Sequence, residues 1–503
     1  MNEEKTEKNE VERTDYRLAM VGIGQAGCQI TESVMRKVKK VKNLTRYADF
    51  LDALGGPESP RVWAIDLGKG VQNENVFQNI PNRIWAGQSQ NIDGAGGNPF
   101  VGEQLYDKVE GEIKGILDRI LQPKPNIVIV AFSASGGTGA SWGPILVREI
   151  MNASKTTLHI YAFIVVPMEL EQNAGPVTIS YSLGRFMQYY EKLNKENKLV
   201  DSKIIPILLS NEQIINKLQK RYPSGSNAFW YRVTNVLTAD VLTELLYTTI
   251  SKHIKDYVQQ LDPNDIGAPL SPDRPFIVVN FSQVPSPEQY RREGTVPSEA
   301  KSILRQIFEQ TIRDFIIANE LNLGLIDSDS LSELAENAES EPLKITGSTS
   351  ALSDDFAITR LFPIIYGVDE KLVRSDILEE WSRALVETKE LHKFQYVTGD
   401  TSRNLRAIDF HKPGAYAITL DKTEDSIDDD KGAHILTLLY GPKLKVFDEL
   451  MDSYKGYDKY DRLESYARLG MDETTAETYE KEILGRIYRY MGKKLEDTDE
   501  KEE

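Results

Sequence analysis

Long apolar runs alternate with segments of helical periodicity over the first half of the chain. Residues 101–121, for example, place apolar side chains three and four positions apart, as an amphipathic helix does. Strands that are apolar throughout and alternate with helices indicate a parallel sheet covered on both faces. We therefore predict a doubly wound α/β domain over residues 15–226. Its strands are expected at 16–24, 61–68, 126–134, 157–167 and 202–211, and its helices at 28–42, 101–121 and 142–154.

The second half of the chain has a different pattern. Residues 227–260 predict one long central helix, which joins the first domain to a smaller α+β domain at 272–443. A polar, acidic stretch at 327–355 interrupts that domain and is interpreted as an exposed loop or insertion. Residues 1–14 are predicted to be a disordered charged tail, and 444–503 to be helices followed by an acidic tail. Strands of the second domain are expected at 274–284, 357–367, 415–420 and 433–441.

Composition narrows the classes of protein that fit this pattern. The formal net charge is −17, which argues against nucleic acid as a partner. Cys28 is the single cysteine, so no disulfide can form within the chain. No apolar run is long enough for a membrane helix, and the charged first residues lack the apolar core of a signal peptide. We expect a cytoplasmic protein without direct membrane insertion, and the scattered histidines predict no protein-ligated metal site.

Three glycine-rich turns carry the candidate chemistry: GIGQAG at 22–27, GAGGNP at 94–99 and SASGGTGAS at 133–141. Backbone amides at the start of a helix bind phosphate, and glycine lets the ligand approach closely. In a doubly wound sheet, turns that follow the strands meet at the carboxyl edge. Three converging turns suit a triphosphate better than a pyrophosphate. The pattern GxxxxGK[ST] is absent, which excludes a Walker-type nucleotide hydrolase.

A dinucleotide-dependent oxidoreductase is one alternative, because Gly22, Gly24 and Gly27 follow the GxGxxG pattern. That class predicts an acidic residue about 20 positions further on. The first suitable residue is Asp66, about twice as far away, and no hydride-transfer site is evident. The alternative also leaves the other two glycine turns unexplained.

The three turns, taken in order with other short segments, resemble the tubulin/FtsZ superfamily. LAMVGIGQAGCQI resembles its first phosphate loop, GAGGNPFVGE the loop for the γ-phosphate, and SGGTGAS its glycine signature. VVPMELEQ is similar to the ribose loop, and SNEQI and VTNVLTADV are similar to segments that contact guanine. These matches cover residues 16 to about 266. Together they resemble a divergent, archaeal-type member of the superfamily, CetZ-like or FtsZ-like. The resemblance implies a GTP-binding domain that takes GTP or GDP with Mg²⁺.

The resemblance also implies a set of cofactor-binding residues. Those expected at the phosphates are Gly24, Gln25, Gly96, Gly97, Asn98, Gly136, Gly137, Thr138 and Gly139, with the Ser135 hydroxyl as a further candidate contact. Ala26 and Asp66 are also expected to bind the cofactor. Those expected at the base and ribose are Gln29, Glu171, Asn211 and Asn235.

The superfamily's hydrolytic loop, NxDxxD, has its best match in QLDPND at 260–265. The resemblance makes Asp262 and Asp265 the catalytic residues of a loop at 261–271 that reaches the nucleotide of the next subunit. A carboxylate there can orient a water and accept its proton. The implied protein is a GTPase that assembles head to tail into protofilaments, its main partner a second copy of itself, with accessory or membrane-adaptor proteins as further partners. From the residues alone, D-P-N-D is also an ordinary turn.

Several positions depart from the superfamily pattern. Ser135 and Ser141 replace glycines of the signature, Gly68 replaces an acidic residue linked to the magnesium site, and Pro263 stiffens the hydrolytic loop. These changes permit slow hydrolysis, or a non-hydrolysing structural or scaffold protein of the same fold. Cys28 is interpreted as a packed residue at a helix start, the alternative being a thiol that bound nucleotide shields from alkylation. The tyrosine-rich segment YEKEILGRIYRYMG is expected to pack on the core rather than bind a partner.

Overall fold

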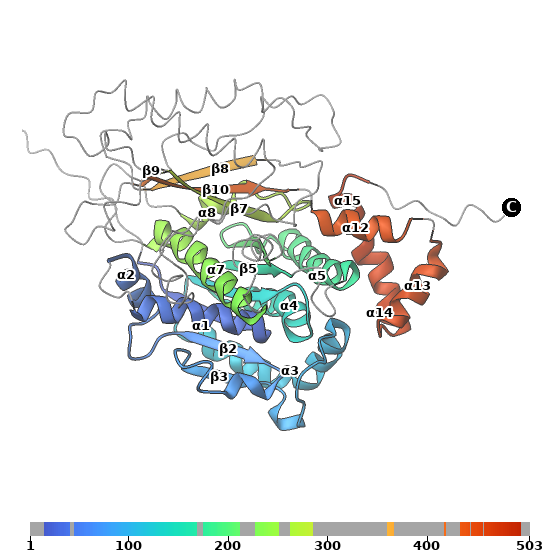
Figure 1. Ribbon diagram of the computed structural model, residues 1–503, viewed down its shortest axis with the longest axis horizontal. Coiled ribbons are helices and arrows are strands. Elements are labelled where there is room, and N and C mark those ends of the chain that lie inside the picture. Colours follow the sequence, from blue (N-terminus) through green and yellow to red (C-terminus); the bar gives the residue numbers. More distant parts are fainter. Residues whose placement is uncertain are drawn as a thin grey trace, which may run out of the picture.

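A computed structural model gives the architecture as one ten-stranded sheet with helices on both faces (Figure 1). The strands follow the order β3-β2-β1-β4-β5-β6-β7-β10-β8-β9. The structure describes residues 15–40, 45–167, 175–211, 227–250, 262–284, 360–366, 417–418, 433–442, 444–455 and 457–493.

Seven strands, from β3 to β7, form a parallel sheet. The sequence predicts the parallel arrangement and five of these strands, whereas it does not predict β3 and assigns β7 to the second domain. Chain order reverses around β1, which pairs with β2 on one side and β4 on the other, so the loops after β1 and β4 leave toward opposite faces at this switch point. The strands are β1 Leu18–Ile23, β2 Val62–Asp66, β3 Asn82–Trp85, β4 Ile127–Ser133, β5 His159–Val166, β6 Lys203–Ser210 and β7 Ile277–Val284.

Three further strands continue this sheet without a break. Strand β10, Ala433–Tyr440, runs antiparallel to β7 and to β8, Arg360–Tyr366. Strand β9, Ala417–Ile418, pairs parallel with β8. These three strands therefore join the parallel part of the sheet through the β7–β10 pairing.

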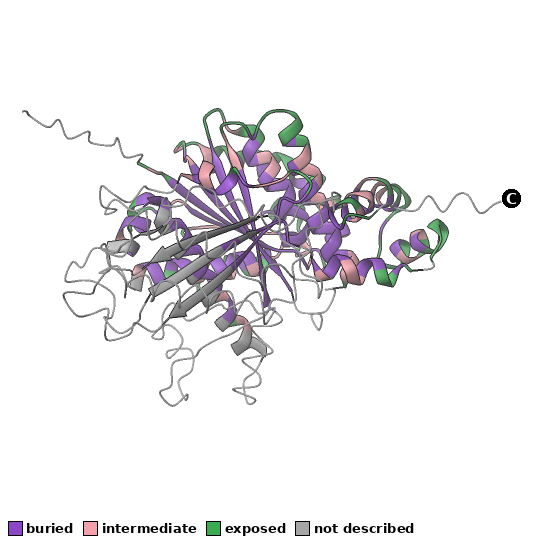
Figure 2. Cartoon of the chain, turned by 90° about the horizontal axis from the view of Figure 1, so that it is seen from above, coloured by how far each residue is buried: buried purple, intermediate pink, exposed green. Residues whose placement is uncertain are grey.

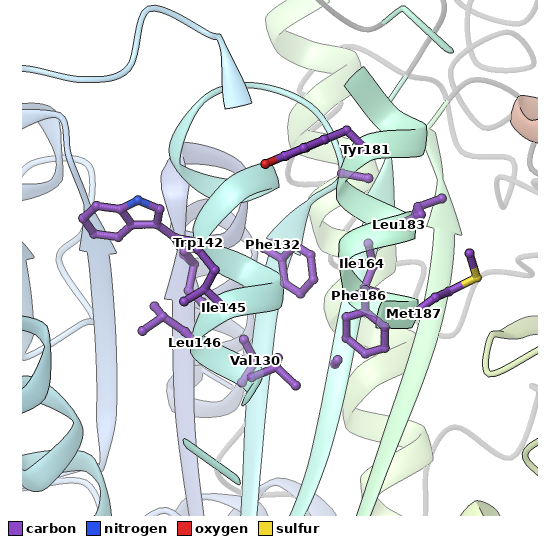
Figure 3. Close-up of a cluster of buried hydrophobic side chains, with 14 of the residues drawn as sticks. Val130, Phe132, Trp142, Ile145, Leu146, Ile164, Tyr181, Leu183, Phe186 and Met187 are labelled. Carbon is purple, nitrogen blue, oxygen red and sulfur yellow. The ribbon is translucent and has the colours of Figure 1, made fainter. Parts of the chain in front are cut away.

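Successive residues of β1 point into two separate cores, because side chains alternate across a strand. Leu18 and Met20 face a core covered by helices α1, α2 and α7, whereas Ala19 and Val21 face a core covered by α3, α4 and α5. Part of the second core is seen in Figure 3, where side chains of α4 and α5 lie over β4. The helices are α1 Gly24–Lys40, α2 Thr45–Ala53, α3 Pro99–Leu121, α4 Thr138–Ala153, α5 Pro176–Lys195 and α7 Asn227–Ile250.

Helices α1 and α4 begin earlier than the periodicity predicts, at Gly24 and Thr138, inside the glycine-rich turns themselves. The predicted long helix extends over 227–250 in the described residues, and its expected remainder, like the acidic stretch at 327–355, falls outside them. Two 3-10 turns, η1 Lys69–Gln72 and η2 Gln88–Gln90, flank β3. Among the helices of the described residues, none combines the length and the apolarity needed to cross a bilayer.

The C-terminal helices pack on α5 and complete the second core. Gly184 of α5 leaves room for Ile483, since a Cβ at that glycine would lie 2.2 Å from the Ile483 Cγ2 atom. Tyr479 and Tyr490 are fully buried, so the core-packing interpretation of this tyrosine-rich segment is confirmed. Figure 2 shows buried positions running through the sheet and exposed positions on the outer helices. The elements are α12 Lys445–Ser453, α13 Lys459–Arg468, α14 Glu473–Thr478, the π-helical η8 Tyr479–Leu484 and α15 Gly485–Tyr490.

Candidate functional site

A cavity of about 1000 Å³ opens at the carboxyl ends of β1, β2 and β4. Ile23, Asp66 and Ser133, the last residues of these three strands, contribute to its wall. Residues of α1 and the start of α7 complete it, and its volume lies within the range of small-molecule sites. The position, at the switch point of the sheet, is where α/β proteins bind their ligands.

The three glycine-rich turns meet at this cavity through direct backbone contacts. A Cβ on Gly24 would lie 2.7 Å from the amide nitrogen of Gly139, and a Cβ on Gly137 would lie 2.5 Å from the Ala95 Cβ. Gly24 also has φ +68° and Gly136 has φ +83°, a backbone conformation that costs little only for glycine. The turns can therefore close together only because Gly24 and Gly137 carry no side chain at these contacts.

Helix α4 presents free backbone amides to the cavity. It begins after Gly137, and no side chain caps its N-terminus. The first N–H groups of a helix lack partners within the helix, and the helix dipole is positive at this end. Gly137 and Thr138 both line the cavity. This end of α4 is consequently a site that favours an anion such as a phosphate group.

Most of the residues predicted to bind the cofactor line this one cavity. They are Gly24, Gln25, Ala26, Gln29, Asp66, Gly96, Gly97, Ser135, Gly136, Gly137, Thr138, Gly139 and Asn235. Their roles toward a ligand stay predictions.

Two predicted residues that the structure describes are not brought to the cavity wall. The Asn98 side chain accepts hydrogen bonds from the amides of Phe100 and Val101, so it caps α3, and its Nδ2 donates to the Leu469 carbonyl at 3.0 Å. Asn211 follows β6 and is buried, but does not line the cavity. Glu171 lies outside the described residues.

One end of the cavity combines polar groups with an aromatic ring. The Asn235 Nδ2 donates to the Gln29 Oε1 at 3.2 Å, joining α7 to α1. Tyr231 lies one turn before Asn235 on α7 and also lines the cavity. Paired amides with an adjacent aromatic ring are suited to a planar heterocycle, which they can hydrogen-bond at its edge and cover on its face.

The set of predicted residues left out part of the wall, including Ile23, Gly94, Ala95 and Ser133, which lie inside the three glycine-rich turns. Glu32, Ser33 and Arg36 follow Gln25 and Gln29 at helical spacing on α1, a signal that could have found them. Val76 and Phe77 come from the loop before β3 and carry no motif. The missed lining residues are Ile23, Glu32, Ser33, Arg36, Gly68, Val76, Phe77, Gly94, Ala95, Ser133, Tyr231 and Arg232.

The two serines of the glycine signature have different surroundings. The backbone of Ser135 does not adopt a positive φ, so this residue carries no left-handed strain. Its amide donates to the Ser133 Oγ at 3.2 Å, and both residues line the cavity. Ser141 lies in α4, and its Oγ donates to the Gly137 carbonyl at 2.7 Å, beside Gly102 of α3. Only Ser135 is therefore placed where a ligand could contact it.

Asp66 is a partly buried carboxylate in the cavity wall. Burial raises its pKa, while hydrogen bonds from the Thr138 side chain and from the Gly68 and Leu67 backbone act in the opposite direction. A nearby cation stabilises the charged form of such a partly desolvated carboxylate. Asp66 and Thr138 are thus oxygen groups suited to a hard divalent ion.

Asp262 and Asp265 lie at the opposite edge of the sheet. Asp265 belongs to a short helix, α8 Pro263–Gly267, and Asp262 is its N-cap, so the two form a capping box rather than part of an open loop. The Asp262 Oδ1 accepts from the Asn264 amide at 2.7 Å, and the Asp265 Oδ2 from the Asp262 amide at 3.4 Å. Their backbone hydrogen bonds bear out the turn chemistry read from D-P-N-D.

The position of α8 is fixed by its neighbours at the amino ends of the strands. Gly267 contacts Lys203, the first residue of β6, with 2.8 Å between a Cβ built on Gly267 and the Lys203 Cγ. Asp262 interacts electrostatically with Tyr16, just before β1, and with His159, the first residue of β5. Neither aspartate lines the cavity of its own chain.

A cavity at the switch point, closed by glycine turns and helix starts, is the arrangement of a nucleotide-binding α/β protein. Residues 17–193 match the model of the Tubulin/FtsZ family, GTPase domain. The resemblance predicted from the glycine turns is thereby confirmed. A phage tubulin-like protein from Pseudomonas phage 201phi2-1 is 24% identical over 194 residues, which is 34% of this chain and 56% of that protein. The match thus spans little more than half of this curated relative.

Solved structures share the fold over a longer part of the chain. CetZ2 from Haloferax volcanii, in a GTPγS-bound protofilament, is 11% identical with a TM-score of 0.51, covering 88% of this chain and 99% of that one. CetZ from Methanosaeta thermophila strain DSM 6194 is 17% identical with a TM-score of 0.52, covering 92% and 96%. At such identities the likeness shows the fold.

Proposed function

We propose that this protein is a cytoskeletal-type GTPase that binds GTP or GDP in the cavity at the carboxyl edge and assembles head to tail. The observation that carries the proposal is the placement of two groups on opposite edges of one sheet. The glycine-lined cavity lies at the carboxyl ends of the strands, and the carboxylates of α8 lie at the amino ends. The family match of residues 17–193 supports guanine nucleotide as the ligand.

In this proposal the phosphates lie on the glycine turns. The uncapped N-terminus of α4 and the turn at Gly96 and Gly97 supply backbone amides, and the Ser135 hydroxyl adds a donor. Gln29 and Asn235 hydrogen-bond the base, and the Tyr231 ring covers it. Asn211 and Glu171 are proposed to complete the base and ribose contacts, as the sequence resemblance implies.

Magnesium fits the donor groups of the cavity. The ion would neutralise charge on the phosphates, and Asp66 with Thr138 would hold it directly or through water. Burial raises the pKa of Asp66, and a cation close to the carboxylate would lower that pKa again.

In this proposal, neighbouring copies in an assembly are related by a translation along the direction of the strands. A copy displaced in that direction brings its α8 edge onto the cavity edge of the first copy, where Asp262 and Asp265 face the nucleotide. Such a heterologous contact does not close on itself and extends into an open filament. A carboxylate delivered in this way can orient the attacking water. The CetZ2 neighbour, solved as a GTPγS-bound protofilament, supports this arrangement.

The test measures light scattering and phosphate release together on purified protein with GTP and Mg²⁺. Asp262→Asn and Asp265→Asn remove each charge while an amide oxygen still caps α8. We expect both variants to bind GTP and assemble, with phosphate release reduced about 10²–10⁴-fold, the range for loss of general base catalysis. Asp273→Asn is the matched control, because Asp273 is an exposed aspartate on the turn that follows α8.

A second candidate function is favoured by the capping box. Both aspartates already bind backbone amides of their own turn, so each has less freedom to engage a water. A nucleotide-binding scaffold that assembles without hydrolysis would use α8 only as an interface. Assembly with no phosphate release, unchanged in Asp265→Asn, would establish this second function. Absence of guanine nucleotide binding would contradict both.

A further inference from the structure

The C-terminal helices are hydrogen-bonded to the start of α3, directly after the turn that carries Gly96 and Gly97. The Asn98 Nδ2 donates to the Leu469 carbonyl at 3.0 Å, across 371 positions of sequence. One turn further along α3, the Gln104 Nε2 donates to the Asp472 Oδ2 at 3.0 Å. Gly96 and Gly97 line the cavity, so these two bonds connect the C-terminal helices to a wall of the proposed nucleotide site.

Leu469 is held for this contact by the end of α13. Gly470 follows it with φ +87°, and the Met471 amide donates to the Tyr466 carbonyl at 3.1 Å. This is the left-handed helix ending that glycine favours. The Gly470 turn packs against Asn98 itself, since a Cβ on Gly470 would lie 3.1 Å from the Asn98 Nδ2.

A buried row of aromatic rings runs beneath these hydrogen bonds. Phe100, at the start of α3, meets Tyr181 of α5 edge to face at 4.7 Å between ring centroids. Tyr181 stacks on Tyr479 at 6.0 Å, and Tyr479 meets Tyr466 of α13 at 4.8 Å. All four side chains are at most 1% exposed. Close-packed interiors transmit displacement, so a shift of α13 reaches the first turn of α3.

We infer that α13 and α14 position the Gly96–Gly97 turn for the phosphates, with Asn98 as the positioning residue. The Asn98 side chain does this by capping α3 with its Oδ1 and holding Leu469 with its Nδ2. The ligand's identity rests on the function proposed above, whereas the ordering of the turn is a property of the chain alone. Nucleotide binding and formation of the Asn98–Leu469 contact are thermodynamically coupled. If the contact raises the affinity for nucleotide by a given factor, bound nucleotide raises the equilibrium constant for forming the contact by the same factor.

The first experiment disturbs the contact from its remote side. Gly470→Ala forces a side chain into a left-handed position and against Asn98, whereas Gly485→Ala adds a methyl group in open space within a helix. Hydrogen exchange of the unliganded protein is followed within residues 98–102. The amide of Asn98 is bonded in the preceding turn, and those of Phe100, Val101 and Gly102 are bonded to Asn98 in the α3 cap. We expect exchange there to be about 3- to 10-fold faster in Gly470→Ala, the range for loss of one hydrogen bond, with Gly485→Ala unchanged.

The second experiment uses both partners of the bond. Asn98→Ser retains a capping oxygen but cannot reach Leu469. Nucleotide affinity is expected to fall about 3- to 10-fold in each single variant and no further in the double variant, because both remove the same bond. Additive losses, or unchanged exchange at 98–102 in Gly470→Ala, would overturn the inference. If the wild-type chain binds no guanine nucleotide, the proposed function fails, and the exchange comparison still decides the role of Asn98; if Gly470→Ala does not fold, exchange and affinity of Asn98→Ser decide it.

Discussion

Gly24 and Gly139 touch backbone to backbone, with 2.7 Å between a Cβ built on Gly24 and the Gly139 amide nitrogen. They belong to the turns after β1 and β4, which are neighbouring strands at the switch point. The contact fixes the helix starts of α1 and α4 side by side on the same cavity. Two amide-rich helix ends are thereby available to one ligand.

Gly24→Ala should both destabilise the fold and remove ligand binding. The new methyl group meets the Gly139 backbone and requires φ +68°, which is unfavourable for an L-residue. Left-handed strain and overpacking together predict a loss of about 2–4 kcal/mol of unfolding free energy, measured by urea denaturation. Gly115→Ala is the control, because Gly115 lies in α3 with nothing within 4 Å of its Cβ. We expect that control to be neutral or slightly stabilising, and equal losses in both variants would contradict the role of the contact.

Cys28 should resist alkylation whether or not nucleotide is present. Its side chain is 0% exposed, and its Sγ donates to the Gly22 carbonyl at 3.5 Å. Burial, and next the charge of Asp66, raises the thiol pKa, so little thiolate forms. We expect iodoacetamide to label the chain only at the rate of unfolding. A measurable native rate that GTP lowers would instead support shielding by the ligand.

The apolar pattern was sufficient for the strands that are buried on both faces. β1, β4 and β5 are buried at every position, and such strands read as unbroken apolar runs. β3 escaped prediction because all four of its residues are only partly buried and its sequence, NRIW, is half polar. Helix α5 was also missed. It buries small polar residues such as Ser180 and Ser182, which weaken the contrast between its faces.

The candidate site likewise has a part that the sequence predicts and a part that only the folded structure reveals. Glycine turns are local in sequence, and their backbone geometry is a property of a few adjacent residues, so they could be found directly. Asn98 was expected at the phosphates, but its side chain is committed to the α3 cap and to Leu469, a contact that no local pattern contains. Arg36 and Phe77 reach the cavity from different segments, and only the packing of α1 against the loop before β3 brings them together.

His159 should make the protein sensitive to mild acid. Burial lowers its pKa from 6.5 to about 4, against an opposing effect of Asp262, and the Lys203 charge lowers it further. The folded state therefore binds fewer protons than the unfolded chain between these values, so stability is complete above pH 6.5 and falls as the pH drops toward 4. The full loss is on the order of 3 kcal/mol.

Denaturant titrations at several pH values between 7 and 5 measure how the free energy of unfolding changes with pH. His159→Gln removes the titrating imidazole but keeps a polar side chain. The free energy of unfolding of this variant should therefore change less than that of the wild type between pH 7 and 5. Asp66, whose pKa burial raises, contributes with the opposite sign, but it is present in both proteins and cancels in the difference. Identical slopes for wild type and His159→Gln would show that protonation of His159 is not what destabilises the fold.

Glu480 should be essential for the C-terminal helices to fold onto the core. It is 6% exposed, and its carboxylate accepts from the Arg462 Nε and the Tyr466 hydroxyl, each at 2.7 Å. Arg462 is equally buried, so removing the carboxylate leaves a guanidinium without its counter-charge. Breaking a buried ion pair on one side typically costs about 3–5 kcal/mol.

Glu480→Gln tests this with little change of shape. We expect a loss of stability close to that range, together with faster proteolysis within α13 and α14. The exposed pair of Arg468 and Glu464 on α13 provides the comparison, since Glu464→Gln should cost about 0–1 kcal/mol. If Arg462→Met in the Glu480→Gln background restores stability, the cost is that of the unpaired guanidinium. A double variant no more stable than Glu480→Gln would instead assign it to the lost hydrogen bonds.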